Sequence, residues 1–579
     1  MNTQGTLEEG QAVVSSDPVS TSVESKISKG WRFFLLPALL YTILFIGFTY
    51  PAITHFSSHI WCGAGDGLQM VWNVWWVDKA VSELHQQPWF TQYLHHPHGT
   101  HLLVHTFHPL KGLMAIPLLR FLSLGETYNV LVLFSFVMGG ITAFWLALRV
   151  SKAYWPSIVG GFVFSFSNYH FAHAQGHMQL ISMEWIPLFV LLWFSWLARP
   201  SWKLSLSTAA SLVMVLMCDH YYFLYCVMTG GLMVLWKAIA DRQVLFLCRK
   251  PYRLPLIVFV LSTLATCGVF VGFTMLEMHR DPPFSFFHPS EFSMDLLAFV
   301  IPGGHWRFNE LTKAYWSSVP GIIHGSSVHV GIAVLVLAAI GAWRGVREKQ
   351  KLGVWLFLAA FFFVMALGPR LYIWGWEAPY VGDYEGRWLK MPYTFLSHFV
   401  PPMKVGARPN RLVIITILSM AVLVPMGLRY LLSRGPKVRA GALGLLLLMM
   451  FEYLPSPLPL FRIETPRYVE YLAADDTQGA VFDNTTHPPI MMYFQTLHEH
   501  PVSFGYISRT HESLFEKQCR FVDLYEANNF SELHDTYGFR FVVAPAEKDV
   551  VGHYPGARLV VEDEDVNLYD LDAQDHRTP

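Results

Sequence analysis

Residues 33–53 read FFLLPALLYTILFIGFTYPAI and contain no charged side chain. About 20 residues of helix cross the hydrocarbon core of a bilayer, so this stretch predicts a membrane-spanning helix. The polar segment 1–30 precedes it, and no run of small residues suggests a cleavage site. We therefore interpret residues 33–53 as a retained span and not as a removable signal peptide.

Further apolar runs recur along the chain. They cover residues 127–148, 155–171, 178–198, 204–218, 221–240, 254–278, 329–345, 352–373, 412–432 and 441–461. Together with the first run they predict an α-helical polytopic membrane protein with about 11 transmembrane helices. Two regions allow alternatives: 204–240 is either one long bent helix or two short ones, and 113–124 is either a re-entrant or an interfacial helix.

The composition excludes several other protein classes. Hydrophobic residues make up 53% of the chain and charged residues only 14%, against roughly 25% charged in a soluble domain. This excludes a disordered chain, a coiled coil and a broadly basic nucleic-acid binder. The net charge of −1 indicates no nucleic-acid partner. The six cysteines are scattered and form neither a metal-binding spacing nor a disulfide framework.

Lysine and arginine fall on every second loop when all eleven runs are counted. These basic clusters lie at 26–32, 149–152, 199–203, 242–253, 344–351 and 429–439. Short cytoplasmic loops collect positive charge, so the pattern predicts a multi-pass protein of the inner cell membrane with a cytoplasmic N-terminus and an extracytoplasmic C-terminus. The large loops 54–112, 279–328 and 374–411 then lie on the outer face.

Three parts of different composition are predicted along the chain. Residues 1–30 are polar and without helical periodicity, which is typical of a disordered cytoplasmic tail. Residues 31–461 form the transmembrane part. Residues 462–579 have a soluble composition, with β-like runs at 480–482, 540–544 and 557–561 and helical stretches at 468–473 and 512–524. This last part predicts a small extracytoplasmic α/β domain.

The first outer loop opens with Gly63-Ala-Gly-Asp66-Gly-Leu-Gln69, followed by the tryptophan-rich run MVWNVWWVDK. That run predicts an interfacial helix, because Trp is favoured at the membrane surface. Asp66 and Gln69 match a capping box, in which Asp66 is the N-cap and Gln69 the N3 residue. The alternative is functional: Asp66 is a carboxylate held at the membrane surface as a general base.

Two segments are rich in histidine. His95, His96, His98, His101, His105 and His108 fall within fourteen residues, which allows either a metal site or a polar surface loop of unrelated imidazoles. His170, His173 and His177 would share one face of a continuous helix, although Gly176 weakens it. Glu184 follows within an apolar run, where an ionisable group is either functional or hydrogen-bonded at a helix end.

Three polar constellations remain on the outer side. Asp219 interrupts the apolar stretch 204–240, which fits a tight turn between spans. Asp295 is placed to cap a helix that lies along the membrane. Lys404, Arg408 and Arg411 precede a span on the outer face, against the positive-inside rule. Guanidinium groups bind phosphate oxygens in bidentate fashion, so this patch predicts a phosphate ligand. The alternative is contact with lipid headgroups or with the C-terminal part.

The order of several short motifs resembles the GT-C glycosyltransferase superfamily and, within it, a bacterial YfhO-like group. The motifs cover most of the chain beyond residue 60. They are Gly65-Asp66-Gly-Leu-Gln69, the Ser167 to His177 segment with Trp185-Ile-Pro187, Ser293-Met-Asp295-Leu-Leu with Pro302, Ala366-Leu-Gly-Pro-Arg370, Arg408-Pro-Asn-Arg411, Tyr493-Phe-Gln-Thr-Leu-His498 and Gly505-Tyr-Ile-Ser-Arg509.

This resemblance implies an enzyme that takes a sugar from a polyprenyl-phosphate donor at the outer membrane face. A saccharide, lipid or protein would be the acceptor, and the anomeric carbon would be inverted. Asp66 would deprotonate the acceptor hydroxyl, and Arg408 and Arg411, with His173 or His177, would stabilise the departing lipid phosphate.

Gln69 and Asp295 are further candidates for binding the substrate. The paired acidic residues of some relatives are missing next to Asp66, so dependence on a divalent metal stays open. The candidates for a second carboxylate are Asp78, Glu184, Asp219 and Asp295.

Two other function classes fit parts of the pattern. A transporter or flippase for lipid-linked saccharides would explain the spans and the outer basic patch. It predicts ionisable groups deep within several helices, whereas most of them here lie at the outer ends. A non-catalytic membrane scaffold would need Asp66 only for capping, which is worth about 1 kcal/mol.

Overall fold

A computed structural model describes most of the chain. The described residues are 29–283, 288–320, 327–348, 352–377, 389–400, 403, 406, 408–462, 464–477, 479–563 and 565–572. The predicted tail 1–30 therefore lies outside the described residues except for its last two positions. Lys404 of the predicted basic patch lies outside them as well.

A helix occupies each of the eleven apolar runs. The main helices are α2 (Leu36–Thr49), α5 (Leu124–Ser151), α6 (Tyr154–Ser165), α9 (Trp185–Ala198), α10 (Trp202–Leu216), α11 (His220–Ala240), α12 (Lys250–Thr263), α13 (Val269–Arg280), α16 (Ile332–Arg347), α17 (Gly353–Ala366), α20 (Val413–Leu432) and α21 (Pro436–Glu452). Within the described ranges, 6 helices are long and apolar enough to cross a membrane. The chain is thus a helical membrane protein, while the count of 11 spans stays a prediction. The 204–240 region consists of two helices, α10 and α11.

Helix α20 forms the centre of one half of the bundle. It packs against α5, α6, α16 and α17. Of the most apolar stretch within Pro409–Leu432, 94% is buried inside the protein. The crossing with α16 is close because glycines face each other: a Cβ on Gly427 would lie 2.0 Å from the carbonyl oxygen of Leu337, and one on Gly341 would lie 2.3 Å from that of Leu423. Small residues at such crossings let helix backbones approach within a membrane.

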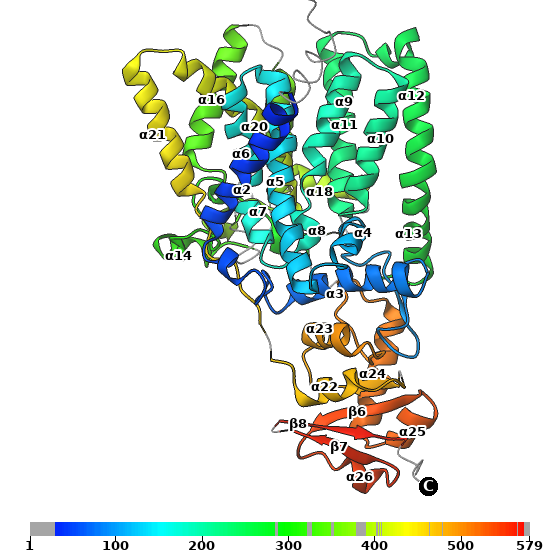
Figure 1. Ribbon diagram of the computed structural model, residues 1–579. Coiled ribbons are helices and arrows are strands. Elements are labelled where there is room, and N and C mark those ends of the chain that lie inside the picture. Colours follow the sequence, from blue (N-terminus) through cyan, green and yellow to red (C-terminus); the bar gives the residue numbers. More distant parts are fainter. Residues whose placement is uncertain are drawn as a thin grey trace, which may run out of the picture.

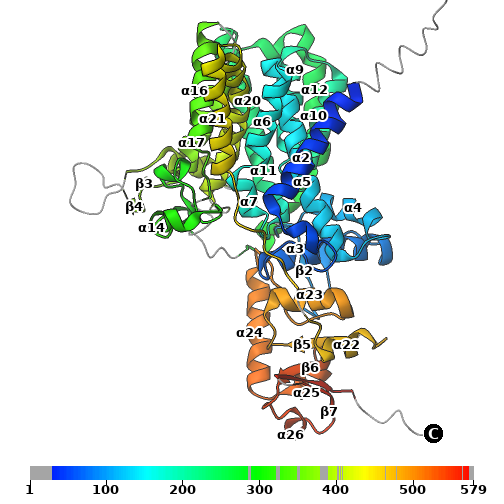
Figure 2. The same cartoon turned by 60° about the vertical axis from the view of Figure 1, so that its left-hand side comes forward.

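Most of the polar elements gather at one end of the bundle (Figure 1). Helices α3 (Asp66–Asp78) and α4 (Pro109–Leu118) lie across this end. The short hairpin β1 (Phe90–Thr91) and β2 (Thr100–His101) belongs to the same loop. On another side lie α14 (Lys313–Trp316), β3 (Tyr372–Ile373), β4 (Trp376–Glu377) and α18 (Pro392–Phe399) (Figure 2).

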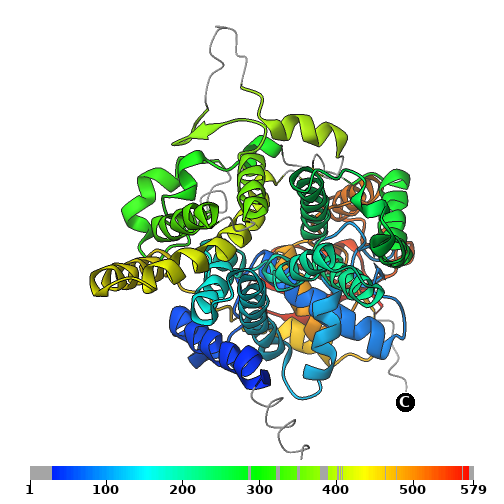
Figure 3. The same ribbon diagram turned by 90° about the horizontal axis from the view of Figure 1, so that it is seen from above.

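The C-terminal region extends beyond this end of the bundle (Figure 1), and in the view from above its orange and red elements lie behind the helices (Figure 3). A four-stranded sheet in the order β5-β6-β8-β7 forms its centre, with β5 parallel to β6 and the other pairs antiparallel. The elements are α22 (Arg467–Ala473), β5 (Ala480–Asp483), α23 (Pro488–His498), α24 (Glu512–Glu526), α25 (Phe530–Asp535), β6 (Phe539–Pro545), α26 (Val550–His553), β7 (Arg558–Glu562) and β8 (Val566–Asp570). All predicted elements occur here, whereas β8 was not predicted.

The tryptophan-rich helix α3 differs from the prediction in what it packs against. Trp72 and Trp76 are fully buried in a core shared with Val481, Met492 and other C-terminal residues. The indole nitrogen of Trp72 donates a hydrogen bond of 2.7 Å to Gln495 on α23. These tryptophans therefore attach the C-terminal region to the bundle and do not face the lipid surface.

Candidate active site

Helix α3 begins at Asp66 itself. Its N-cap is Gly65, which has no side chain to cap the helix, so the predicted capping box is wrong. The start of α3 is tightly packed, because a Cβ on Gly67 would lie 2.6 Å from the Cβ of Cys62. A backbone hydrogen bond of 2.8 Å from Gly63 to Gln175 ties this loop to the second histidine segment. The Asp66 carboxylate is consequently left for contacts outside its own helix.

His177 is one partner of this carboxylate. Its Nε2 lies 2.9 Å from Oδ2 of Asp66, with 40% of the Asp66 side chain exposed. The ring of His173 meets that of His177 edge-on at a centroid distance of 5.2 Å. The histidines do not lie on one continuous helix, because α7 (Asn168–His173) ends before Gly176 and α8 (Met178–Ile181) begins after His177. The break turns His177 toward Asp66, while His170 is buried and bonded to backbone carbonyls.

Tyr506, from the C-terminal region, is a second partner. Its side chain is hydrogen-bonded to Asp66, and burial together with this carboxylate raises the pKa of the phenol. Gln69 holds the same residue, since its Nε2 donates a hydrogen bond of 2.5 Å to the Tyr506 carbonyl oxygen. Sequence reasoning identified Gln69 but not Tyr506, although Tyr506 lies in one of the quoted motifs.

Three guanidinium groups gather around Tyr221 at the start of α11. The Arg411 guanidinium lies over its ring, 4.9 Å from the centroid, and Nη2 of Arg509 donates a hydrogen bond of 3.1 Å to its hydroxyl. Arg408 lies over the ring of Phe292 at 3.3 Å and interacts electrostatically with both other arginines. The predicted pair Arg408 and Arg411 is thus together, and Arg509 is a third cation that the sequence analysis did not select.

The electrostatics of this cluster favour an anion. Burial, followed by the charges of Arg411 and Arg509, lowers the pKa of Arg408 to about 9. Asp219 is the acidic group nearest in effect: burial raises its pKa to about 7, against the opposing influence of Arg411. Asp219 also caps α11, accepting a hydrogen bond of 2.9 Å from the Tyr222 amide, as the predicted turn requires. Guanidinium groups this close repel one another, so an anion placed among them would be stabilised.

One short segment joins the two groups of residues. Tyr506 bonds Asp66 and Arg509 bonds Tyr221, and three residues of extended chain span at most about 11 Å. A narrow pocket at the arginine side is lined by Tyr221, Leu224, Tyr225, Tyr393, Met403, Gly406, Arg408 and Leu412. Among the described residues Asp66 does not line this pocket, so a cavity shared by Asp66 and the arginines stays a prediction.

Asp295 occupies a different position from the other predicted site residues. Its buried carboxylate caps the 3₁₀ turn Leu296–Phe299 through the Leu297 amide at 2.9 Å. It also accepts hydrogen bonds from the hydroxyl of Tyr315 at 2.9 Å and the amide of Gly375 at 2.8 Å. The predicted capping role is therefore observed, and Asp295 joins two loops and is not brought to Asp66.

The first histidine segment packs against the C-terminal region. Nδ1 of His95 lies 2.6 Å from Nε2 of Gln518, His98 stacks on Phe521, and Nδ1 of His105 accepts a hydrogen bond from the Ser508 amide at 3.1 Å. Within the described part of the chain, no group of three or more His, Cys, Asp or Glu side chains is arranged to hold a metal ion. The histidines that pack here serve as contacts between two regions.

Glu184 forms a fully buried ion pair. Its Oε1 lies 2.7 Å from Nζ of Lys111 on α4, with both side chains completely inaccessible. Lys111 also donates a hydrogen bond of 2.7 Å to Ser135 on α5. The pair holds α4 against the helices beside it, which agrees with the structural alternative for Glu184.

Comparison with solved structures finds a similar fold in glycosyltransferases of membranes. The arabinofuranosyltransferase AftD from Mycobacteria is 13% identical over 94% of this chain, with a TM-score of 0.55, and the match covers 42% of AftD. This likeness shows that the two chains share a fold. The present chain spans less than half the length of AftD.

Two other structures match at lower scores. ArnT from Cupriavidus metallidurans, bound to undecaprenyl phosphate, is 11% identical with a TM-score of 0.47, over 94% of this chain and 98% of ArnT. The oligosaccharyltransferase AglB from Archaeoglobus fulgidus, in complex with an inhibitory peptide and a dolichol-phosphate, is 11% identical with a TM-score of 0.44, over 90% and 70%.

Sequence comparison is informative at the family level. No curated protein matches this sequence, and the YfhO-like affiliation stays a prediction. One family model matches residues 38–385, more than half of the chain. The chain therefore belongs to the family described as domain of unknown function DUF6311.

Proposed function

We propose that this protein transfers a sugar from a polyprenyl-phosphate donor to an acceptor hydroxyl at the outer face of the membrane, with inversion at the anomeric carbon. The observation that carries the proposal is the link made by residues 506–509. It connects a carboxylate with two polar partners to a cluster of three buried or half-buried arginines.

Asp66 is the proposed general base. Its carboxylate contacts His177 and is hydrogen-bonded to Tyr506, and these two partners hold it in position. Its side chain is 40% exposed, so an acceptor can reach it. The acceptor hydroxyl loses its proton to Asp66 while its oxygen forms a bond to the anomeric carbon. A positioned base contributes about 10²–10⁴-fold to the rate.

The arginines are the proposed site of the leaving group. As the bond between the anomeric carbon and the phosphate oxygen breaks, negative charge grows on the lipid phosphate. Arg408, Arg411 and Arg509 surround Tyr221 where that charge would be stabilised. The apolar residues Leu224, Met403 and Leu412 beside Arg408 suit the first part of a prenyl chain.

The orientation in the membrane is part of the proposal. Asp66, the arginines and the C-terminal region lie at one end of the bundle (Figure 1). Basic loop residues such as Arg199, Lys203 and Lys437 flank helix ends that the charge pattern assigns to the cytoplasmic side. The site would therefore face the outside of the inner membrane.

The test is sugar transfer by the purified protein in lipid. A panel of polyprenyl-phosphate sugars is supplied, and release of the lipid phosphate and formation of product are followed. Asp66→Asn should lower kcat about 10²–10⁴-fold and leave donor binding intact. Asp535→Asn changes an exposed aspartate of the C-terminal region; it is the control and should stay active. Normal transfer by Asp66→Asn would disprove the role of the base.

The same preparation distinguishes the alternative functions. A transporter or flippase would move lipid-linked saccharide across the vesicle bilayer without releasing the lipid phosphate. A scaffold would do neither. Movement of the donor without its cleavage would therefore replace the transferase proposal.

A further inference from the structure

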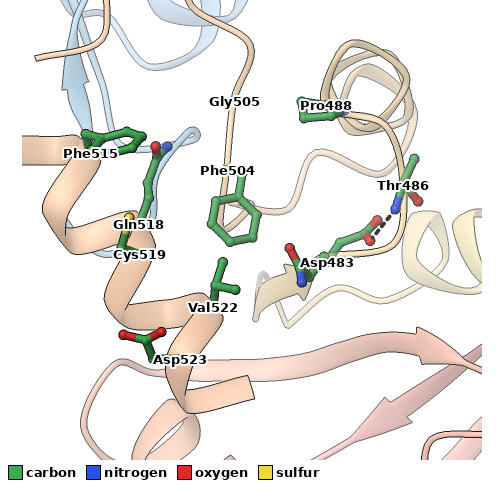
Figure 4. Close-up of a pocket in the computed structure, with 11 residues that line it drawn as sticks. Asp483, Thr486, Pro488, Phe504, Gly505, Phe515, Gln518, Cys519, Val522 and Asp523 are labelled. Carbon is green, nitrogen blue, oxygen red and sulfur yellow. Dashed lines mark hydrogen bonds between the residues drawn. The ribbon is translucent and has the colours of Figure 1, made fainter. Parts of the chain in front are cut away.

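A pocket of the C-terminal region lies beside the segment that bonds Asp66. It has a volume of about 450 Å³, within the range of roughly 300–1,000 Å³ typical of ligand sites. Figure 4 shows α24 on one side, the turn after β5 on the other and Phe504 between them. The lining residues are Asp483, Asn484, Thr486, Pro488, Phe504, Gly505, Phe515, Gln518, Cys519, Val522 and Asp523.

The lining has the chemistry of a neutral polyhydroxyl ligand. No lysine, arginine or histidine is among these described residues, which argues against a phosphate. The side chains of Asn484 and Asp523 make no hydrogen bond or ion pair with another described residue and can serve a ligand. Phe504 and Phe515 contribute aromatic rings to the lining, and an aromatic ring packs well against the C–H side of a sugar ring. Carboxylate and amide groups beside an aromatic ring suit sugar hydroxyls.

The position of the pocket connects it to the proposed base. Gly505 lines the pocket, and the next residue, Tyr506, is hydrogen-bonded to Asp66. Neighbouring Cα atoms are 3.8 Å apart. A Cβ on Gly505 would also lie 3.1 Å from Nε2 of His95, so this backbone is fixed between the C-terminal region and the first outer loop. The wall of the pocket is therefore one residue away from the tyrosine that bonds the Asp66 carboxylate.

We infer that this pocket binds the acceptor, and that the acceptor is a neutral saccharide chain whose end reaches Asp66. The inference rests on the proposed function and names its acceptor class. It selects the saccharide among the saccharide, lipid and protein acceptors, because carboxylate and amide side chains lie beside aromatic rings in the lining, no cationic side chain is among the described lining residues, and the pocket is located in the C-terminal region.

The test separates binding from transfer. The full-length protein in lipid nanodiscs is applied to an array of neutral hexose and pentose oligosaccharides. Phe515→Ala and Asp523→Asn should each weaken binding about tenfold, equivalent to about 1.4 kcal/mol. Glu516→Gln changes an exposed carboxylate of the same helix outside the pocket and should bind as the unchanged protein does. Asp66→Asn should bind normally.

Each outcome is decisive. The absence of binding to every saccharide on the array, or equal binding by Phe515→Ala, Asp523→Asn and Glu516→Gln, would overturn the pocket assignment. In the transfer assay, Phe515→Ala should raise the KM for the acceptor about tenfold with the donor KM unchanged. An unchanged acceptor KM would overturn the acceptor role. Saccharide binding without transfer from any donor would instead contradict the proposed function and leave the pocket intact.

Discussion

The Asp66 region and the arginine region differ in how far their charged side chains are exposed to solvent. Asp66 is 40% exposed and has its partners, His177 and Tyr506, to one side. The arginines are more enclosed, and burial is the main reason why the pKa of Arg408 falls to about 9. A base must stay open to an incoming acceptor, whereas a site for a phosphate gains strength from exclusion of water. The contrast predicts separate kinetic effects for the two regions.

The largest effect after loss of the base is expected at Arg411. Arg411→Gln removes a charge that would bond phosphate, and such hydrogen bonds contribute about 1.5–3 kcal/mol. Affinity for a polyprenyl phosphate should fall about 10–100-fold, measured by binding in nanodiscs. Arg429→Gln, at the other end of α20, is the control, since Arg429 bonds the Ser151 carbonyl oxygen. Equal affinity of the two variants would place the phosphate elsewhere.

Tyr506→Phe tests the Asp66 region. It removes the hydroxyl that bonds Asp66 and keeps the ring. A loss of about 1 kcal/mol should lower kcat about fivefold, with donor affinity unchanged. Tyr471→Phe on α22, an exposed tyrosine, provides the control. A change in donor affinity with constant kcat would mean that Tyr506 belongs to the arginine side.

The sequence predicted the helices well and the partners of the site residues poorly. Apolar runs of span length are local patterns, and a helix occurs at each of them. The sequence analysis selected charged residues and histidines in the loops next to apolar runs, where such residues are uncommon. These are Asp66, His177, Arg408 and Arg411. Tyr506 was missed because its role depends on a contact with Asp66, 440 positions earlier in the numbering, which no local pattern encodes.

The same limit applies to two segments whose residue types allow more than one role. The tryptophans of α3 match an interfacial helix in composition, yet their burial is decided by docking of α23. The histidine loop 95–108 matches a metal-binding composition, yet His95 and His98 meet side chains of α24. In both segments the residue types are compatible with two different roles, and only the tertiary contacts show which role a residue has.

Asp219 should make donor binding depend on pH. Its pKa is raised to about 7 by burial, so the group is mostly neutral below this pH and negative above it. A sugar phosphodiester keeps its charge over this range. Donor affinity should therefore fall a few-fold as pH rises through about 7, since the new carboxylate opposes an anion near Arg411. Asp219→Asn should bind independently of pH in this window; a pH dependence identical to that of the unchanged protein would exclude Asp219 as its cause.

The smallest effect concerns the contact between the first outer loop and the C-terminal region. Burial lowers the pKa of His95 to about 3, below its ordinary value of 6.5, so the folded protein holds it neutral with Nδ1 beside Gln518. The stability from this group is complete above about pH 6.5 and is lost as pH falls toward 3, because the unfolded state then binds the proton. The slope is at most about 1.4 kcal/mol per pH unit for one group.

Hydrogen exchange measures this contact directly. Amides of residues 95–108 and of α24 should exchange faster at about pH 5 than at about pH 7.5 after correction for intrinsic rates. His95→Gln should reduce this difference, whereas His55→Gln, a change at an exposed histidine, should not. Equal protection of both segments at the two pH values would show that the imidazole does not control docking, and that other contacts, such as the one between α3 and α23, hold the region that supplies Tyr506 and Arg509 to the site.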